Sequence, residues 1–238
     1  MFDHVTIRVA ELDASREFYE TVLGPLGHAG GRQFDEWGDF SIAPGSDEHA
    51  LTRRLHVCFV AGSQADVDAF WRAGRDAGYP SDGAPGPRPE YHEHYYGGFL
   101  LDPDGNSVEA AYHGRAREGA TNIDHLWIRV RDPQASERFY ATIAPVVGLN
   151  VRKGRFGIVV AAHDRSITLL RGEPTENVHI AFPAHSDDTV REFHRVAVAE
   201  GYRDNGAPAE RGIYHPGYYG AFVVDGDGNN IEAVNHNR

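Results

Sequence analysis

The chain has 238 residues, of which 41% are hydrophobic and 24% charged, and its formal net charge is −12. This length and composition suit a globular protein of two domains, each with about 120 residues and its own core. The negative charge opposes binding to a phosphate backbone, so we expect no nucleic-acid partner. No apolar run could span a bilayer and no signal peptide is evident, so we expect a cytoplasmic protein without a membrane partner. Because Cys58 is the single cysteine, an intrachain disulfide and a thiolate cluster are excluded, and imidazole and carboxylate must hold any metal.

The first predicted elements are a strand and a helix. DHVTIRV, at 3–9, alternates as a strand does, with aliphatic residues on one face and His4 on the other. A helix is expected over residues 14–23, with Asp13 as its N-cap and Gly24 after its end.

The next predicted elements repeat this order. LHVCFVA, at 55–61, again sets a histidine, His56, against an aliphatic face. A helix is expected to begin at Ser63, with Asp66 as a capping-box partner, and to end at Gly78. Strands then flank the sequence DPDGN, whose proline and glycine positions favour a type I turn.

The second half of the chain is a copy of the first. His125 follows His4 by 121 residues, and after a small difference in length Glu232 follows Glu109 by 123. Each copy itself reads as two smaller halves with the order strand, helix, strands, so the pattern indicates an internal duplication.

The ends of the two copies are the most alike. Segments 95–110 and 218–233 share 10 of their 16 residues. We therefore predict two domains, residues 1–115 and 122–238, joined by a polar linker at 116–121.

Six polar residues oppose aliphatic neighbours on these strands. They are His4, His56 and Glu109 in the first copy and His125, His179 and Glu232 in the second. If helices cover the aliphatic face, the polar residues line the other face, where two imidazoles and a carboxylate can hold a divalent metal and leave positions open. Taken singly, each histidine could be a hydrogen-bonded core residue and each glutamate a surface residue. All six positions survive although the intervening segments 28–44 and 150–170 have diverged, which favours the metal sites.

A strand histidine near the N-terminus, a second one 52 residues later and a glutamate that closes DPDGNxxE resemble the vicinal oxygen chelate superfamily. This superfamily includes glyoxalases, fosfomycin resistance proteins, bleomycin resistance proteins and extradiol dioxygenases. The resemblance covers almost the whole chain, once per copy. It implies an α+β fold of tandem domains built from four βαβββ units, whose curved mixed sheets form metal-binding cups with helices outside.

The resemblance also implies the metal ligands. In one copy they are His4, His56 and Glu109, and in the other His125, His179 and Glu232. Some relatives build a cup from units of different domains or chains. A set of metal ligands that combines residues of both copies is therefore an alternative.

The reaction is less defined than the fold. Glyoxalases carry a fourth protein ligand on a strand that here reads DFSIAPG or RSITLLRG, without Glu, Gln or His at the expected place. Three ligands suit an extradiol dioxygenase or a fosfomycin-type thiol transferase. His92 and His215 match the histidine of the extradiol signature, but Phe99 and Phe222 replace its tyrosine. We expect these two phenylalanines to contact substrate.

His92 and His215 are the candidates for acid or base catalysis, because imidazole titrates near neutrality. The alternative is that they only solvate the mouth of each cup. Tyr95 and Tyr218 lie four residues before the two phenylalanines and are the candidates for the missing hydroxyl.

Two further pairs of residues repeat between the copies. Arg8 and Arg129 share a strand face with the first histidine of each copy, so they are candidates for binding an anionic substrate, or they balance the glutamates. His113 and His236 also repeat, near the ends of the copies, and we expect both on the surface.

We therefore expect a metal-dependent enzyme whose small-molecule substrate chelates the metal through vicinal oxygens, with a preference for dioxygenase chemistry. The alternatives are a glyoxalase-type lyase or isomerase, a thiol transferase, and, in another class, a metal-free binding protein of the bleomycin resistance type. Fe(II) or Mn(II) is favoured, and Zn(II), Ni(II) and Co(II) also suit the ligands. We expect a monomer or a homodimer.

Overall fold

The computed structural model describes residues 1–28, 30–31, 35–115 and 121–237. The chain divides into two compact units. Unit 1 comprises Met1–Thr6 with Trp127–Arg238, and unit 2 comprises Ile7–Leu126. The predicted linker at 116–121 falls largely on residues 116–120, which lie outside the described residues. The domain boundaries read from the sequence stay a prediction.

The first half of the chain forms two successive repeats of strand, helix and strands. The first contains β1 (His4–Val9), α1 (Leu12–Leu23), a short 3₁₀ turn (Gly24–Leu26), β2 (Glu36–Trp37) and β3 (Phe40–Pro44). The second contains β4 (His56–Val60), α2 (Gln64–Asp76), β5 (Ser81–Pro87), β6 (Tyr96–Leu101) and β7 (Ser107–Tyr112).

The second half repeats this order. The third repeat contains β8 (Ile123–Val130), α3 (Pro133–Ile143), β9 (Asn150–Lys153), β10 (Ile158–Ala162) and β11 (Arg165–Arg171). The fourth contains β12 (His179–Pro183), α4 (Asp187–Ala199), β13 (Arg203–Glu210), β14 (Tyr219–Val224) and β15 (Asn230–Asn235). Three of the four predicted repeats are βαβββ units, and the first shows two strands after its helix among the described residues.

Mixed strand pairing places the polar residues next to one another. In unit 2 the strand order is β5, β6, β7, β4 and the first residues of β8, and in unit 1 it is β13, β14, β15, β12 and the first residues of β1. The pairs β4 with β7 and β12 with β15 are parallel, whereas the outer hairpins are antiparallel. The predicted mixed α+β fold is thereby confirmed.

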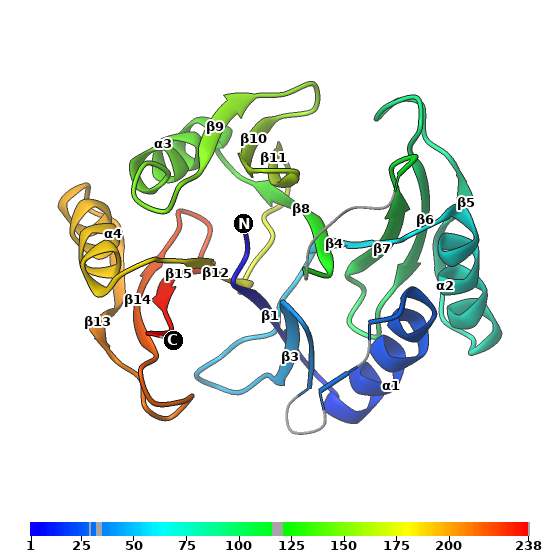
Figure 1. Cartoon of the computed structure of the whole chain (residues 1–238), viewed down its shortest axis with the longest axis horizontal. Coiled ribbons are helices and arrows are strands. Elements are labelled where there is room, and N and C mark those ends of the chain that lie inside the picture. The colour runs from blue at the N-terminus through cyan, green and yellow to red at the C-terminus, as the bar shows by residue number, and fades with distance from the viewer. Residues whose placement is uncertain (29, 32–34, 116–120, 238) are drawn as a thin grey trace. The chain divides into compact units, whose positions relative to one another are not determined.

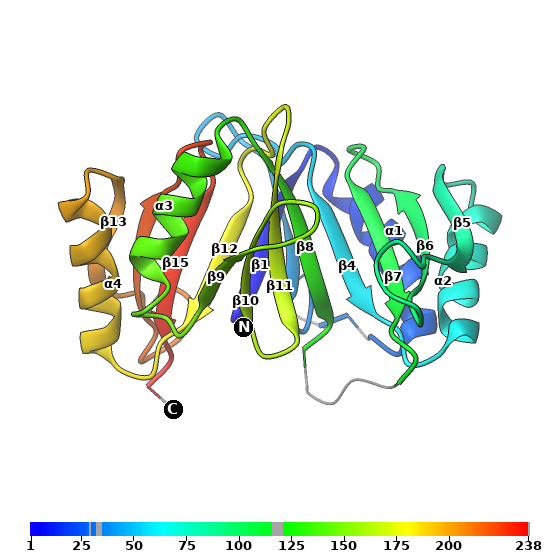
Figure 2. The same ribbon diagram turned by 90° about the horizontal axis from the view of Figure 1, so that it is seen from above.

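Helices cover one face of each sheet. α2 contacts β5, β6 and β7, and α4 contacts β13, β14 and β15; Figure 1 shows α2 beside β5, and Figure 2 shows α4 beside β13. In β1, Val5 and Ile7 are fully buried, while His4 is partly exposed, as the predicted alternation requires. None of the helices among the described residues has both the length and the apolar character that crossing a membrane demands.

The helix ends test the predicted caps. Ser63 caps α2 by accepting a hydrogen bond from the Asp66 backbone N–H (3.2 Å), and Gly78 follows the helix with φ +93°, as predicted. Asp13 is not the N-cap of α1, which begins at Leu12 with Glu11 before it. The Asp13 carboxylate instead pairs with Arg16 one turn later.

The DPDGN turn fixes where β7 lies against β4. The Asp102 carboxylate accepts hydrogen bonds from the backbone and side chain of Asn106 (2.8 and 3.0 Å). Asn106 Oδ1 in turn accepts from the backbone N–H of Leu55 (3.1 Å), the residue before His56. The turn therefore sets the register of the strand that carries His56.

We expect Asn106→Ala to lower the free energy of unfolding by about 2 kcal/mol, because Asn106 is fully buried, and its loss leaves the Leu55 N–H without a partner and removes one hydrogen bond to the Asp102 carboxylate. Asn229→Ala should act alike in unit 1, where Asn229 Oδ1 accepts from Val178 N–H. Urea denaturation measures both changes. Asn150→Ala, at an exposed position, is the control, and a buried variant no less stable than this control would contradict the assignment.

Candidate metal centres

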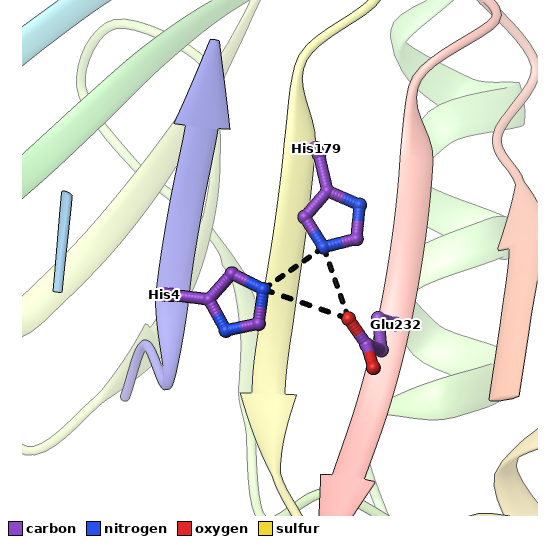
Figure 3. A group of neighbouring side chains, drawn as sticks. All are labelled: His4, His179 and Glu232. Atoms are coloured by element: carbon purple, nitrogen blue, oxygen red, sulfur yellow. Dashed lines mark hydrogen bonds and ion pairs between the residues drawn. The ribbon is translucent and has the colours of Figure 1, made fainter. Parts of the chain in front are cut away.

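Three side chains of unit 1 converge on one point. His4 of β1, His179 of β12 and Glu232 of β15 form this group, here called centre 1. The two Nε2 atoms lie 3.1 Å apart, and Glu232 Oε2 lies 3.0 Å from His179 Nε2 and 3.6 Å from His4 Nε2. Figure 3 shows the three side chains pointing toward one another from their strands. The spacing is that of ligands around one cation.

Unit 2 contains the same arrangement, here called centre 2. It consists of His56 of β4, Glu109 of β7 and His125 of β8. Glu109 Oε2 lies 3.0 Å from His56 Nε2 and 3.6 Å from His125 Nε2. The glutamate is 1% exposed here and 0% exposed in centre 1, so each centre has a buried carboxylate.

Each centre combines residues of both sequence copies. His4 lies opposite Ala181 in the pairing of β1 with β12, and Ala181 lies beside Glu232 in the pairing of β12 with β15. Strand pairing therefore brings His4 to Glu232, not to Glu109. The three candidate ligands of one copy therefore do not come together. Each centre takes its first histidine from the other copy, an arrangement that the sequence analysis left open. All six predicted residues fall in the two centres, and their role as ligands stays a prediction.

Small residues make room for the two glutamates. A Cβ atom at Gly97 would lie 2.5 Å from Glu109 Oε1, and one at Gly220 would lie 2.5 Å from Glu232 Oε1. Because real Cβ atoms do not approach oxygen this closely, only glycine leaves the carboxylates where they are.

The hydrogen-bond partners of the two Nδ1 atoms in centre 2 determine that these nitrogens carry hydrogen. The Ser107 hydroxyl donates to Asp82 (2.7 Å), so it accepts from His56 Nδ1 (3.1 Å). The Asp124 carboxylate accepts from His125 Nδ1 (2.7 Å). Both rings therefore carry hydrogen on Nδ1, and in a neutral ring this leaves the Nε2 lone pair facing the glutamate oxygen.

Two imidazole nitrogens and a carboxylate oxygen that face one point form a donor set that fits a divalent metal ion. In centre 1 His4 Nδ1 likewise donates to Asp3 (2.8 Å), while His179 Nδ1 lies 2.6 Å from the side-chain amide of Asn230.

The tyrosines hold the second oxygen of each glutamate. The Tyr95 hydroxyl donates to Glu109 Oε1 (2.8 Å) and the Tyr218 hydroxyl to Glu232 Oε1 (2.7 Å). Burial, together with the neighbouring carboxylate charge, raises the pKa of both tyrosines well above 10, so both stay protonated. Their predicted catalytic role is untested, and the contact that the structure gives them is with a candidate ligand.

Burial also acts on the carboxyl groups. It raises the pKa of Glu232 to about 7, because the charge of His4 and the hydrogen bond of Tyr218 offset the loss of solvent only in part. Burial would also raise the pKa of Asp3 and of Asp124, but hydrogen bonds from histidines outweigh it and lower both pKa values. Both aspartates are therefore ionised at neutral pH.

Each centre offers three ligands rather than four. Within the described part of the chain, the groups built on Glu232 and Glu109 have two histidines each. A further group, Cys58 with Asp124 and His125, shares a histidine with centre 2 and places a thiol next to it. Neither β3 nor β11 contributes to these groups of described residues, and the lack of a fourth ligand stays a prediction.

His92 and His215 lie outside both centres and contact a second histidine. His92 Nε2 lies 2.9 Å from His113 Nδ1, and His215 Nε2 lies 2.8 Å from His236 Nδ1. The expected surface position of His113 is wrong: its side chain is 12% exposed, because it turns inward to Asp124 (3.0 Å). His236 is 32% exposed and therefore only partly buried.

The two phenylalanines that are predicted to contact substrate each pack beside a candidate ligand histidine. Phe99 packs beside His56, with ring centroids 6.0 Å apart, and the Arg88 guanidinium lies 5.4 Å from the Phe99 ring centroid. In unit 1, Phe222 lies 6.0 Å from His179 and Arg211 lies 5.3 Å from Phe222.

Arg8 and Arg129 are placed by other contacts. Arg8 reaches the Pro44 carbonyl (3.5 Å), and the Arg129 side chain lies against Gly172. Their role in substrate binding stays a prediction.

Sequence reasoning missed the aspartates before the first histidines and the two arginines beside the phenylalanines. Asp3 and Asp124 are 121 residues apart, and Arg88 and Arg211 are 123 apart. The same offsets relate the candidate ligands, so repetition at these offsets was the available signal.

The arrangement of repeats and the two three-residue centres define the class of fold. The chain has the fold of the vicinal oxygen chelate superfamily. It is similar to glyoxalase I from Zea mays (18% identity, TM-score 0.68, covering 99% of this chain and 92% of that one). It is also similar to a candidate dioxygenase from Bacillus subtilis (14% identity, TM-score 0.61, covering 98% of this chain and 84% of that one). No family model and no curated protein sequence matches the chain.

The pKa of Glu232 predicts a pH-dependent stability of the metal-free protein. Between the ordinary pKa of 4.5 and the folded value of about 7, only the folded chain binds this proton. The stabilisation is therefore fully present below about pH 4.5 and is lost as pH rises through about 7. From pH 8 to pH 5.5 it amounts to about 2 kcal/mol.

Urea denaturation of metal-free protein at both pH values measures this effect as the difference between the wild type and Glu232→Gln. The exposed Glu200→Gln should follow the wild type. Parallel profiles for the wild type and Glu232→Gln would contradict the raised pKa.

The glycine contacts predict variants that disable one centre at a time. Gly97→Ala should weaken metal binding at centre 2 at least tenfold, because the added methyl group displaces Glu109, and Gly220→Ala should do the same at centre 1. Titration with Mn(II) or Zn(II) measures the stoichiometry and the two affinities. Gly212→Ala, where nothing lies within 4 Å of the added Cβ, is the control. Two undiminished sites in either glycine variant would refute the close approach.

Proposed function

We propose that the protein is a divalent-metal-dependent enzyme with two equivalent centres, each of which binds a small substrate through vicinal oxygen atoms. The observation that carries the proposal is the convergence of His, His and Glu on one point in each unit. This donor set accepts Fe(II), Mn(II), Zn(II), Ni(II) or Co(II), and Fe(II) or Mn(II) is preferred for the dioxygenase reading. A bound metal with open coordination positions would act as a Lewis acid and orient the chelating substrate.

The chain's own residues support this chemistry. Tyr95 and Tyr218 hold one glutamate oxygen, which leaves Oε2 for the metal. Phe99 and Phe222 pack beside a candidate ligand histidine and can contact the apolar part of a substrate. His92 and His215 stay candidates for acid or base catalysis, and each is joined through Nε2 to a second histidine.

Two histidines and one glutamate per group of described residues favour a dioxygenase-like reaction over a glyoxalase-like one, because the segments DFSIAPG and RSITLLRG have no Glu, Gln or His at the place of a fourth ligand. The similarity to glyoxalase I and to a candidate dioxygenase concerns the fold and does not choose between them. A lyase, an isomerase or a thiol transferase is the second choice.

A metal-free small-molecule binding protein is the alternative of a different class. The presence of two histidines and a buried glutamate in both units favours the metal-dependent enzyme over it. We propose a small molecule as the partner, and neither nucleic acid nor membrane, on account of the net charge of −12.

Paired histidine variants test the proposal and the exchange of residues between copies together. The wild type should bind two metal ions per chain, and His4→Ala/His179→Ala should bind one, because both changes fall in centre 1. His4→Ala/His56→Ala should bind none, since it damages both centres. Elemental analysis after anaerobic purification measures the content, and His194→Ala, whose histidine pairs with Asp204 outside the centres, is the control.

A single remaining ion in His4→Ala/His56→Ala would refute the exchanged sets. A wild type that neither holds nor takes up metal would refute the enzyme proposal. If iron or manganese is found, the next assay is oxygen uptake with catechols. If zinc or nickel is found, the next assays are for lyase and transferase reactions.

A further inference from the structure

The candidate ligand His125 is the inner end of a continuous chain of side chains. His125 Nδ1 donates to Asp124 Oδ1 (2.7 Å), and His113 Nε2 lies 3.0 Å from Asp124 Oδ2. His92 Nε2 lies 2.9 Å from His113 Nδ1. The four residues are joined in one line, and Asp124 uses one oxygen for the ligand and the other for the next histidine.

Unit 1 repeats this chain with different residues. His4 Nδ1 donates to Asp3 Oδ1 (2.8 Å), His236 Nε2 donates to Asp3 Oδ2 (2.9 Å), and His215 Nε2 lies 2.8 Å from His236 Nδ1. The stacked histidine pair has the same ring-centroid separation of 5.1 Å in both units. The same atoms are joined in both units, although the outer ends differ, since His92 Nδ1 accepts from the His94 N–H and His215 Nδ1 faces the Pro216 carbonyl.

The hydrogen bonds of the unit 2 chain have a determined direction. The backbone N–H of His94 donates to His92 Nδ1 (3.1 Å), so His92 carries its hydrogen on Nε2 and directs it to His113 Nδ1. His113 then carries hydrogen on Nε2, which faces the Asp124 carboxylate. Asp124 therefore contacts a histidine through each oxygen, His125 by a hydrogen bond and His113 at ion-pair distance, and it is 2% exposed.

We propose that Asp3 and Asp124 are positioning residues, each of which locks the first histidine of its centre in the tautomer that presents Nε2 to a metal. His236 and His113 hold the second oxygen of each carboxylate and so fix its orientation. Without the carboxylate, imidazole in water distributes its hydrogen between both nitrogens and rotates about its side-chain bonds. The metal part of this inference rests on the proposed function, but the tautomer part does not.

The first test is the tautomer of His125 in the metal-free protein. Long-range ¹H–¹⁵N NMR correlations distinguish a hydrogen on Nδ1 from one on Nε2, and the His125 signals are those lost in His125→Gln. The wild type should show Nδ1–H. Asp124→Ala should show a mixture of tautomers, whereas Asp124→Asn, which keeps an acceptor oxygen, should restore Nδ1–H. An unchanged Nδ1–H tautomer in Asp124→Ala would overturn the inference.

The second test is the affinity for Zn(II) or Co(II) alone, measured by calorimetry. Asp124→Ala should weaken one of the two sites by about 10- to 100-fold and leave the other unchanged. Asp3→Ala should weaken the other site, so Asp3→Ala/Asp124→Ala weakens both. His113→Ala and His236→Ala should each cause a smaller loss, of severalfold, at the site of the aspartate that they contact.

Asp204→Ala removes a comparable aspartate, which pairs with His194 outside the centres (3.0 Å), and should change neither readout. Two wild-type sites with undiminished affinity in Asp3→Ala and Asp124→Ala would overturn the inference while the proposed function stands. A wild type that binds no metal would overturn the proposed function, and the NMR result would still decide the role of Asp124. The Asp→Asn variants supply the comparison if an alanine variant fails to fold.

Discussion

A buried carboxylate on the last strand of each sequence copy is the constraint around which the rest of each centre is arranged. Glu109 and Glu232 are almost inaccessible to solvent, and a buried charge is costly unless hydrogen bonds and opposite charge compensate it. One oxygen of each receives a tyrosine hydroxyl, and the other faces two imidazoles. A glycine on the neighbouring strand leaves the space that the carboxylate occupies. The tyrosine, the two histidines and the glycine around each glutamate are therefore explained by one buried carboxylate, which needs hydrogen bonds and a compensating charge.

The exchange of the first histidine between the copies follows from strand order. β12 pairs with β1 on one side and β15 on the other, so a central strand of one copy receives the first strand of the other copy beside it. His4 consequently belongs to unit 1, although most residues of its own copy belong to unit 2. Each unit contains a complete centre only because of this exchange, which makes the two copies mutually dependent for any metal chemistry.

The sequence predicted what depends on local pattern and repetition. Alternation placed His56 opposite an aliphatic face, and the capping residue Ser63 and the DPDGN turn were found where expected. Asp13 was misplaced because α1 begins earlier, and an aspartate in the first turn can bond a side chain instead of capping. The partner of His4 depends on pairing between strands 175 residues apart, which no local pattern encodes.

The two centres are similar enough that their few differences are informative. Cys58 occupies in β4 the place that Ala181 occupies in β12, so a thiol lies within ligand distance of Asp124 and His125 only in centre 2. Behind the second histidine, Ser107 in centre 2 corresponds to Asn230 in centre 1. A hydroxyl that donates to Asp82 must accept from His56 Nδ1, whereas the Asn230 amide, whose oxygen accepts from Asn205, turns its nitrogen toward His179 Nδ1. His56 therefore carries hydrogen on Nδ1, whereas His179 accepts a hydrogen bond there. These contacts distinguish two centres whose candidate ligand types are identical.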